Sequence, residues 1–353
     1  MANEARTNHA LVLTTLNSPF EKKVLPVTPP GPNEVTIQNY AVGINSVDAA
    51  IPLLGTSLLP YLQLPCVVGC DVAGVVVDVG HEMERFKPGD RVVGYAAGTL
   101  PIGNRPSEGG FQNFTVLRDH LTAVIPSSLP YADAVALSPL CFSTAAYGLF
   151  HHSFLGLSLP GGNAAAPKNG KAIVITSGAS SVGANAIQLA VAAGYEVYST
   201  ASPSNFDLVR SLGATAVFDY HQSNSAAEIV AALKGKEVVG GFSINSGGVA
   251  ICAEVINNSN SRKFIADAGP PPSTGYPEGI TSKFIDLLDV GNPDDVVGKV
   301  YRDFLPQALS TGLFRPAPNP EVVGRSLEDI QEAVNNRLKG VSAVKPVVIV
   351  KED

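Results

Sequence analysis

A glycine-containing turn is the segment of this sequence with the clearest chemical potential. The apolar run Lys171 to Thr176 leads into Ser177-Gly178-Ala179-Ser180-Ser181-Val182-Gly183, and a second apolar run, Ala184 to Ala193, follows. This order predicts a strand, a tight turn and a helix. The first backbone N–H groups of such a helix face outward and attract an anion, so the segment predicts a site for the pyrophosphate of a dinucleotide.

Three positions of the turn have separate physical tasks. Gly178 allows the tight turn, and Gly183 lets the helix pack closely on the strand. Ser180 stands at the middle position of the G-x-G-x-x-G pattern, where its small side chain still permits close approach and its hydroxyl could donate to a phosphate. The match to the pattern is imperfect. The turn nevertheless lies inside a correctly spaced βαβ unit, which favours a phosphate-binding turn over an ordinary one.

The preferred nucleotide is indicated about 20 residues further on, where an NAD site presents an acid to the ribose 2′-hydroxyl. The sequence there is Tyr198-Ser199-Thr200-Ala201-Ser202, which contains no acid. Neutral hydroxyls and Asn205 can donate to a 2′-phosphate, so the pattern favours NADPH. A second interpretation stays open: Ser202 followed by Pro203 is a helix cap, and no basic residue precedes Arg210 to pair with a phosphate.

Alternating strands and helices must position this turn. From Lys171 to about Asp267 the sequence repeats an apolar strand and a helix at roughly the length of a βα unit, which predicts a doubly wound parallel sheet. The expected strands are Ala172 to Thr176, Glu196 to Thr200, Thr215 to Phe218, Val238 to Asn245 and Phe264 to Ala268.

The first 130 residues follow a different pattern. Short β-branched runs separated by Pro and Gly turns predict a mostly antiparallel β domain, and a helix is expected from about Tyr131 to Phe150. Pro346 to Val350 reads as a last strand that returns to this domain. The sequence therefore predicts an α/β protein whose first domain comprises 1–140 and 310–353 and whose second domain, 141–309, binds the dinucleotide.

Composition excludes several other classes of protein. The 353 residues include 24 Lys plus Arg against 31 Asp plus Glu, a formal net charge of -7, so a nucleic-acid partner is not expected. Four cysteines in so long a chain predict reduced thiols and a cytoplasmic location rather than a disulfide framework. The N-terminal residues show no signal-peptide pattern, and no apolar run is long enough to span a membrane.

Several motifs together resemble those of the medium-chain dehydrogenase/reductase superfamily. Asn45-Ser46-Val47-Asp48 resembles the N-x-x-D segment of the zinc-independent branch, Gly69 to Gly74 looks like the G-x-[DE]-x-x-G pattern, and Phe86 to Val92 is similar to the F-x-x-G-D-R-V turn. This resemblance implies a GroES-like catalytic domain and a Rossmann cofactor domain.

A narrower resemblance is to the stand-alone trans-acting enoyl reductases that assist fungal polyketide synthases. It lies in Ser180 to Gly183, Ser202 to Asp207, Leu212 to Ala214 and Phe218 to Tyr220. The resemblance implies NADPH as cofactor and a polyketide substrate, either a free small molecule or one tethered to the carrier protein of a polyketide synthase.

The resemblance also assigns site residues. The cofactor contacts would be Ser180, Ser181 and Val182 at the pyrophosphate, Ser202, Asn205 and Tyr220 at the adenosine phosphate end, Asn45 and Asp48 near the nicotinamide, and Val341 and Ser342 before the last strand. The substrate side would include Leu140, Cys141, Phe142, Ala146 and Tyr147. Two departures from the family pattern are Asn245, where an aspartate is expected, and Ser177, where glycine is common.

The positions that hold catalytic zinc in other branches do not carry a ligand set here. They read Asn45, Cys70 and Cys141, and Gly94 to Gly110 contains no cysteine for a structural zinc lobe. Catalytic zinc needs three protein ligands and an open position. The sequence therefore predicts that no metal is bound.

Without a Lewis acid, conjugate reduction is a more suitable reaction than alcohol oxidation. Hydride passes from NADPH to the β-carbon of an enoyl thioester or enone, and the α-carbon is then protonated. Ser143 and Thr144 are candidate donors to the enolate oxygen, although packing within a helix accounts for them equally well. Tyr61 is a candidate proton source, and an ordered water would serve as well.

Two other functions stay open. One is a quinone or enone reductase that acts on a free small molecule. The other is a protein that binds NADP(H) without net redox chemistry, as a lyase, a cyclase or a sensor, which the departure at Asn245 keeps in view. The sequence determines neither the substrate nor the oligomeric state.

Overall fold

The computed structural model describes residues 6–162, 164–287 and 290–352, and the chain divides into two compact units. The first unit consists of Met1–Leu140 and Asn319–Asp353, and the second is Cys141–Pro318. The sequence predicts a return to the first unit at residue 310, whereas this division places the return at Asn319. The helix Leu305–Thr311 lies across the predicted boundary and belongs to the second unit, which accounts for the later return.

The first unit is built around a largely antiparallel sheet with the strand order β15-β16-β3-β5-β6-β8, in which β7 also pairs with β3. A smaller sheet has the order β2-β1-β4. The strands of the first unit are β1 (Asn8–Leu13), β2 (Glu21–Leu25), β3 (Glu34–Gly43), β4 (Cys66–Val67), β5 (Asp71–Val79), β6 (Arg91–Tyr95), β7 (Phe114–Arg118), β8 (Thr122–Val124), β15 (Asn319–Gly324) and β16 (Val344–Ile349). The helices of this unit are α1 (Ser46–Leu54), α2 (Tyr131–Ala136) and α10 (Ile330–Arg337).

The ten-residue strand β3 organises this unit because three other strands pair with it. β5 lies along one edge, and β7 and β16 share the other. Val35, Ile37 and Val42 of β3 are fully buried in the core of the unit. The predicted return of the last strand is confirmed, since Val348 of β16 pairs with Val42.

The helix expected from Tyr131 to Phe150 is interrupted, so this prediction is wrong in detail. α2 ends at Ala136 and α3 (Pro139–Phe150) begins three residues later. Ser138 has a φ of 54°, which no right-handed helix accommodates. The proline that follows also disfavours a helical conformation at that residue.

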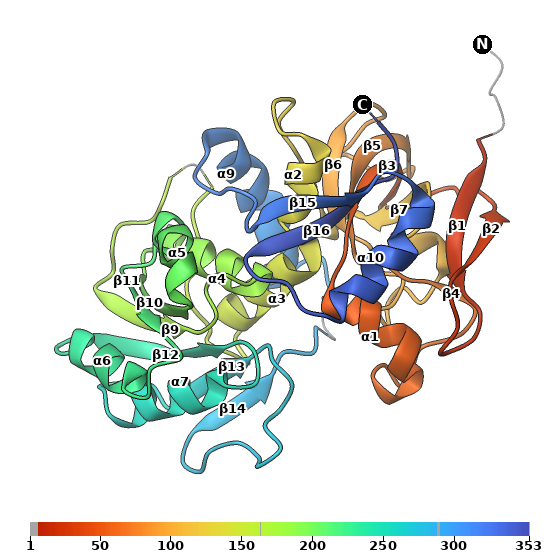
Figure 1. Cartoon of the computed structure of the whole chain (residues 1–353). Helices are drawn as coiled ribbons and strands as arrows, with labels where there is room; N and C mark the ends of the chain where they lie inside the picture. The colour runs from red at the N-terminus through yellow and green to blue at the C-terminus, as the bar shows by residue number, and fades with distance from the viewer. Residues whose placement is uncertain (1–5, 163, 288–289, 353) are drawn as a thin grey trace. The chain divides into compact units, whose positions relative to one another are not determined.

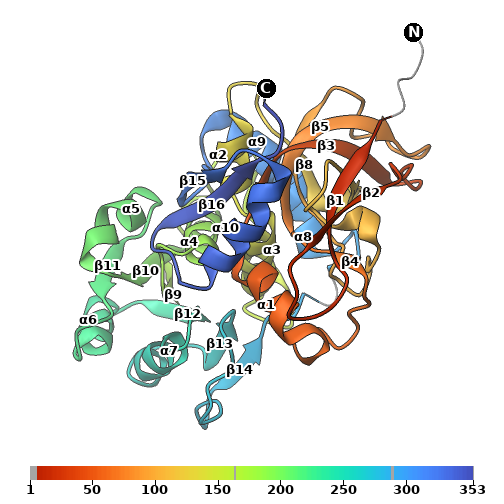
Figure 2. The same ribbon diagram turned by 45° about the vertical axis from the view of Figure 1, so that its right-hand side comes forward.

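The second unit contains a parallel sheet with the order β11-β10-β9-β12-β13-β14, which confirms the predicted doubly wound fold. Its remaining elements are β9 (Lys171–Ile175), α4 (Ser181–Ala192), β10 (Glu196–Ala201), α5 (Phe206–Ser211), β11 (Ala216–Asp219), α6 (Ser225–Ala232), β12 (Glu237–Ser243), α7 (Gly248–Asn257), β13 (Phe264–Asp267), β14 (Thr281–Phe284), α8 (Val296–Lys299) and α9 (Leu305–Thr311). Figures 1 and 2 show α4 and α5 on one face of this sheet and α6 and α7 on the other. The edge strand β14 was not among the predicted strands.

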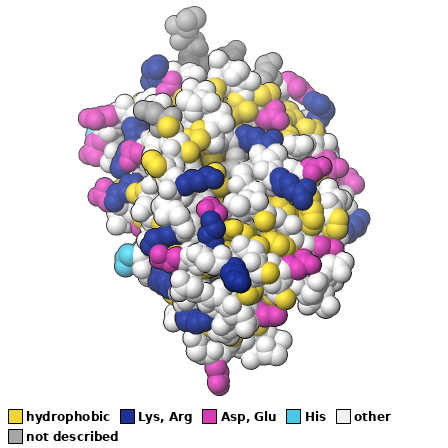
Figure 3. Space-filling model, turned by 90° about the vertical axis from the view of Figure 1, so that its left-hand side faces the viewer, with side chains coloured by type: hydrophobic (Ala, Val, Ile, Leu, Met, Phe, Trp, Pro, Cys, Tyr) yellow, Lys and Arg dark blue, Asp and Glu magenta, His cyan; other side chains and the backbone are white. Residues whose placement is uncertain are grey.

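The surface of the described residues gives no sign of a basic binding face on the side drawn in Figure 3. Acidic and basic side chains are interspersed there rather than gathered by sign. None of the helices in the described part of the chain combines the length and the apolar composition that crossing a bilayer requires.

Two glycines permit the close approach of α4 to β9. A Cβ atom on Gly183 would lie 2.3 Å from the carbonyl oxygen of Ser177, and one on Gly178, just after β9, would lie 2.9 Å from Ile187 Cδ1 of α4 and 2.4 Å from Ser199 Oγ of β10. Real Cβ contacts do not reach such distances. The task that the sequence suggested for Gly183 therefore has a steric basis, whereas Gly178 makes room for side chains of β10 and α4 and does not adopt a positive φ.

Replacement of Gly183 by alanine should destabilise the second unit although alanine favours helices. The steric conflict with the backbone of Ser177 should cost about 1 to 3 kcal/mol, more than the roughly 1 kcal/mol that helix propensity contributes. Gly247→Ala is the matched control, because a Cβ there meets nothing within 4 Å. Denaturant unfolding of both variants tests this, and equal stability would contradict it.

Candidate cofactor site and a buried polar cluster

The strand order of the second unit reverses between β9 and β12, and ligands of doubly wound sheets bind at such a point. Ser177 follows β9 with a φ of 53°, and Asn245 follows β12 with a φ of 66°. The Asn245 amide donates to Ser177 Oγ at 3.1 Å, and that hydroxyl donates to the carbonyl of Ile244 at 3.1 Å. These hydrogen bonds join the ends of β9 and β12. Ser177 and Asn245, the two residues that depart from the family pattern, both take part in them.

The helix α4 begins beside this junction. Ser180 is its N-cap: the Ser180 hydroxyl accepts a hydrogen bond from the Gly183 N–H at 3.1 Å and donates to the Ser177 carbonyl at 2.8 Å. Within the described residues, the N–H groups of Ser181 and Val182 have no acceptor. These two groups and the positive end of the helix dipole are suited to a pyrophosphate. The Ser180 hydroxyl is already used by the cap.

The residues proposed for the adenosine end follow the two neighbouring strands. Ser202 comes directly after β10, and the Asn205 amide donates to Ser202 Oγ at 3.0 Å. Tyr220 comes directly after β11, is about half exposed, and lies against the ring of His221 at 4.1 Å. The nearby Asp219 carboxylate accepts hydrogen bonds from His221, whose backbone N–H lowers the pKa of that carboxyl.

The α3 residues proposed for the substrate side divide into buried and accessible ones. Phe142, Ala146 and Tyr147 are buried. The ring of Phe142 meets that of Tyr301 edge-on at 5.1 Å, and the buried Ser143 hydroxyl lies 3.3 Å from the Tyr301 hydroxyl. The segment also includes residues that are only partly buried: Leu140, Cys141 and Thr144.

In the first unit, residues far apart in the sequence form a buried polar cluster around Asp71 and Lys345. The Lys345 ammonium donates to Asp71 Oδ2 at 2.8 Å, to Asn45 Oδ1 at 2.6 Å and to Ser138 Oγ at 2.9 Å. Asp71 Oδ2 also accepts from the Asn45 amide at 2.8 Å and from Ser138 Oγ at 2.6 Å, and Oδ1 accepts from the Leu140 N–H at 2.8 Å. The Lys345 and Asp71 side chains are 2% and 0% exposed, so the charges depend on each other.

Asp48 lies beside this cluster and caps α1. Its Oδ2 accepts the Asn45 N–H at 2.7 Å. The pKa of the Asp48 carboxyl is raised to about 7. Burial is the largest cause and the neighbouring Asp71 carboxylate adds to it, whereas the Asn45 N–H and the Lys345 charge lower the pKa. Burial likewise raises the pKa of the Cys70 thiol. The Cys70 thiol is therefore uncharged near neutral pH, whereas the Asp48 carboxyl is about half protonated there.

The other predicted site residues of the first unit lie in connecting segments. Tyr61 is partly exposed in the loop after α1, and its carbonyl accepts from the Asn104 amide at 3.0 Å. Val341 and Ser342 are exposed between α10 and β16. The roles of these residues toward a cofactor or substrate stay predictions.

One of the three places compared with zinc ligands lies beside a lysine cation in this structure. Asn45, at the first of them, accepts a hydrogen bond from Lys345. Among the residues that the structure describes, no group of three or more His, Cys, Asp and Glu side chains could hold a metal ion. That the protein works without a metal stays a prediction.

Sequence reasoning missed Lys345 and Ser138. A signal for the first was present, because a lysine between Val344 and a run of apolar residues in a last strand requires a buried counter-charge. The position of its partner was not evident, since Asp71 lies 274 residues away in the sequence. Ser138 gave no comparable signal.

Lys345→Met should strongly destabilise the protein because it leaves the Asp71 carboxylate buried without a cation. The expected loss is about 3 to 5 kcal/mol. Lys345→Met combined with Asp71→Asn should recover much of it, and Lys23→Met, at an exposed ion pair, should change stability by about 1 kcal/mol at most. Urea unfolding tests this, and a Lys345→Met variant as stable as Lys23→Met would contradict it.

The Asp48 carboxyl should give the first unit a measurable pH dependence. Its folded pKa of about 7 lies above the ordinary value of 3.8, so the folded state binds the proton more tightly. The free energy of unfolding should therefore fall as the pH rises from about 4 to about 7, by about 1.4 kcal/mol for each unit of pKa difference. The Asp48→Asn variant, whose amide oxygen can still accept the Asn45 N–H, should not show this fall in the free energy of unfolding. Thermal unfolding of both proteins across this pH range is the measurement. An identical pH profile in both proteins would refute the assignment.

Comparison with known proteins agrees with this architecture. Residues 31–127 match the family model described as alcohol dehydrogenase GroES-like domain. The chain is 42% identical to "Dehydrogenase pigH" of Monascus ruber, over 97% of this chain and 99% of the relative. It is 39% identical to "Trans-enoyl reductase himH" of Aspergillus japonicus, over 82% of this chain and 83% of the relative.

A solved structure supports the same assignment. An alcohol dehydrogenase superfamily protein from Novosphingobium aromaticivorans is 25% identical, with a TM-score of 0.77, over 98% of this chain and all of that one. The resemblance that rests on the motifs is thereby confirmed. The chain belongs to the medium-chain dehydrogenase/reductase superfamily of oxidoreductases.

Proposed function

We propose that this oxidoreductase uses NADPH to reduce a carbon–carbon double bond conjugated to a carbonyl group, in an enoyl thioester or enone of a polyketide-type metabolite. The observation that carries the proposal is the similarity to a trans-enoyl reductase over most of the chain. A stand-alone reductase of this kind takes its substrate from the carrier protein of a polyketide synthase or as a free molecule. The carrier-bound form is our first choice.

The turn before α4 fits a dinucleotide. The N–H groups of Ser181 and Val182 face away from the helix without an acceptor among the described residues, and Gly178 and Gly183 leave no Cβ at the turn. Ser202 and Asn205 provide neutral donors beyond β10, where a carboxylate would repel a 2′-phosphate. These features support NADPH over NADH.

The reaction requires a hydride, a proton and a stabilised enolate. NADPH, when bound, supplies the hydride that the β-carbon receives. The electron pair of the double bond moves to the carbonyl oxygen, and the α-carbon then takes a proton, so that one double bond and one NADPH are consumed together. The protein has to orient the two reactants, exclude water and donate hydrogen bonds to the enolate oxygen.

Of the two candidate hydroxyls on α3, Thr144 suits the enolate better than Ser143. Ser143 is fully buried against Tyr301, whereas Thr144 is partly exposed. Tyr61, also partly exposed, is our candidate for the proton donor, with an ordered water as the alternative.

The cofactor preference can be tested with Ser202→Asp. The purified protein should bind NADPH more tightly than NADH, and the new carboxylate should weaken NADPH binding at least about tenfold, or about 1.4 kcal/mol, through repulsion of the 2′-phosphate. Ser211→Asp, which adds the same charge at the far end of α5, is the control and should leave the affinity unchanged. Nicotinamide fluorescence measures both. If neither nucleotide binds, the turn is structural and the proposal fails.

The reaction class is tested by NADPH consumption with a short enoyl-pantetheine thioester, a free enone and a quinone. Reduction of the thioester with one NADPH consumed per double bond, and deuterium from labelled NADPH found at the β-carbon, is the expected result. Turnover of the quinone alone would establish a quinone reductase. Tight NADPH binding without consumption of any of the three would favour a non-redox role.

A further inference from the structure

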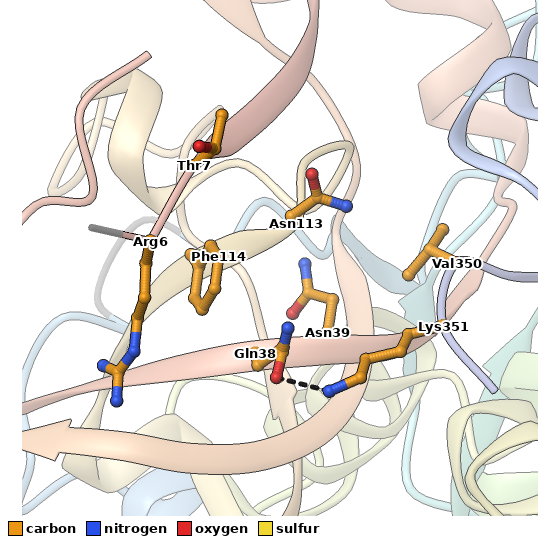
Figure 4. Close-up of a pocket in the computed structure, with 8 residues that line it drawn as sticks. All are labelled: Arg6, Thr7, Gln38, Asn39, Asn113, Phe114, Val350 and Lys351. Carbon is orange, nitrogen blue, oxygen red and sulfur yellow. Dashed lines mark hydrogen bonds between the residues drawn. The ribbon is translucent and has the colours of Figure 1, made fainter. Parts of the chain in front are cut away.

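A pocket of about 410 Å³ lies in the first unit, at a place where two strands meet end to end. β7 pairs with β3 over Glu34 to Gln38, and β16 pairs with the same edge over Ala41 to Gly43. Between these stretches both chains stay bonded to β3: the Asn113 carbonyl accepts from the Asn39 N–H at 2.8 Å, and the Tyr40 carbonyl accepts from the Val350 N–H at 2.8 Å. The pocket beside this junction is lined by Arg6, Thr7, Gln38, Asn39, Asn113, Phe114, Val350 and Lys351 (Figure 4).

The polar lining presents donors almost exclusively. The Gln38 Oε1 accepts from the Lys351 ammonium at 2.7 Å, and the Asn113 Oδ1 accepts from the His9 N–H at 3.0 Å. The carbonyl ends of both amides are thus used within the protein, which leaves their NH₂ groups as donors. Figure 4 shows Arg6 and Lys351 at opposite ends of the lining.

The charge of the lining is also unusual for this chain. It contains two cations and no carboxylate, although acids outnumber bases by 31 to 24 in the sequence. Within the described part of the chain, the Arg6 guanidinium makes no hydrogen bond or ion pair. The Lys351 ammonium lies over the Tyr40 ring at 4.7 Å and is paired with an amide rather than an acid. The two positive charges are therefore available to an anion.

One buried acceptor completes the lining. Asn39 is 1% exposed, and its NH₂ group donates to the Gly110 carbonyl, the Gln112 carbonyl and Thr115 Oγ1. Its Oδ1 is buried with no hydrogen-bond partner among the described residues. A buried acceptor in this condition is costly unless a ligand or water donates to it.

We propose that this pocket binds a small organic anion that carries a carboxylate or phosphate together with a hydroxyl or amide donor. The anionic group would be attracted by the charges of Arg6 and Lys351 at the two ends of the pocket, and the donor would reach Asn39 Oδ1. Phe114 and Val350 would contact a short apolar body. The volume lies in the range of small-molecule sites, about 300 to 1,000 Å³. This inference is independent of the proposed reaction.

The test is calorimetric titration of the full-length protein with inorganic phosphate, glycerol 3-phosphate and glycerol. Glycerol 3-phosphate should bind more tightly than phosphate because it adds hydroxyl donors, glycerol alone should not bind, and added salt should weaken binding. The double variant Arg6→Gln/Lys351→Gln should lose at least about tenfold in affinity, or about 1.4 kcal/mol. Both side chains lie at the surface, so the variant should fold.

The matched control is Lys22→Gln/Lys23→Gln, which removes two positive charges from β2 of the same unit and should leave the affinity unchanged. An equal loss in both double variants would show a general charge effect and overturn the site. Unchanged binding by Arg6→Gln/Lys351→Gln would place the anion elsewhere, for example at the start of α4, and would also overturn it. The same holds if the unaltered protein fails to bind glycerol 3-phosphate at about 10 mM.

Discussion

The carboxylate of Asp71 is the group on which the first unit depends. An ionised carboxylate in a protein interior needs both a counter-charge and hydrogen-bond donors. Here the donors come from three separate segments: Lys345 in β16, Asn45 before α1, and Ser138 and Leu140 at the start of α3. None of them can shift without leaving a buried charge short of a partner. The Asp71 carboxylate on β5 thereby fixes the start of α1, the break between α2 and α3, and the position of β16.

The second unit is organised by a different principle. Its candidate site depends on backbone groups brought close together, because Gly178 and Gly183 have no side chains to keep β9 and α4 apart. Ser177 and Asn245 adopt left-handed conformations at the strand ends and fasten them to each other. Polar groups of Asp71 and Lys345 are satisfied within the protein, whereas the N–H groups of Ser181 and Val182 at the start of α4 have no acceptor among the described residues. The first region stabilises the fold of its own unit, and the second is the one at which we propose that the dinucleotide binds.

Much of this arrangement could be predicted from local patterns. The apolar strands from Lys171 to Ala268, the glycine turn and the returning last strand follow from periodicity and turn chemistry, which neighbouring residues determine. The partner of Lys345 could not be predicted, because two residues 274 positions apart leave no joint pattern in one sequence. The same holds for β14, which owes its existence to pairing with β13. The use of the Ser180 hydroxyl as a helix cap was within reach, since a serine at the start of a predicted helix is the usual capping residue.

The separation of Asp71 from Lys345 has a consequence for the order in which the protein acquires its structure. The whole second unit, Cys141–Pro318, lies between them in the sequence. During synthesis the second unit is therefore complete before the cation that the first unit requires has been made. Domains usually fold in the order in which they emerge. Here the unit that begins first is expected to finish last, with its central carboxylate open to water until β16 arrives.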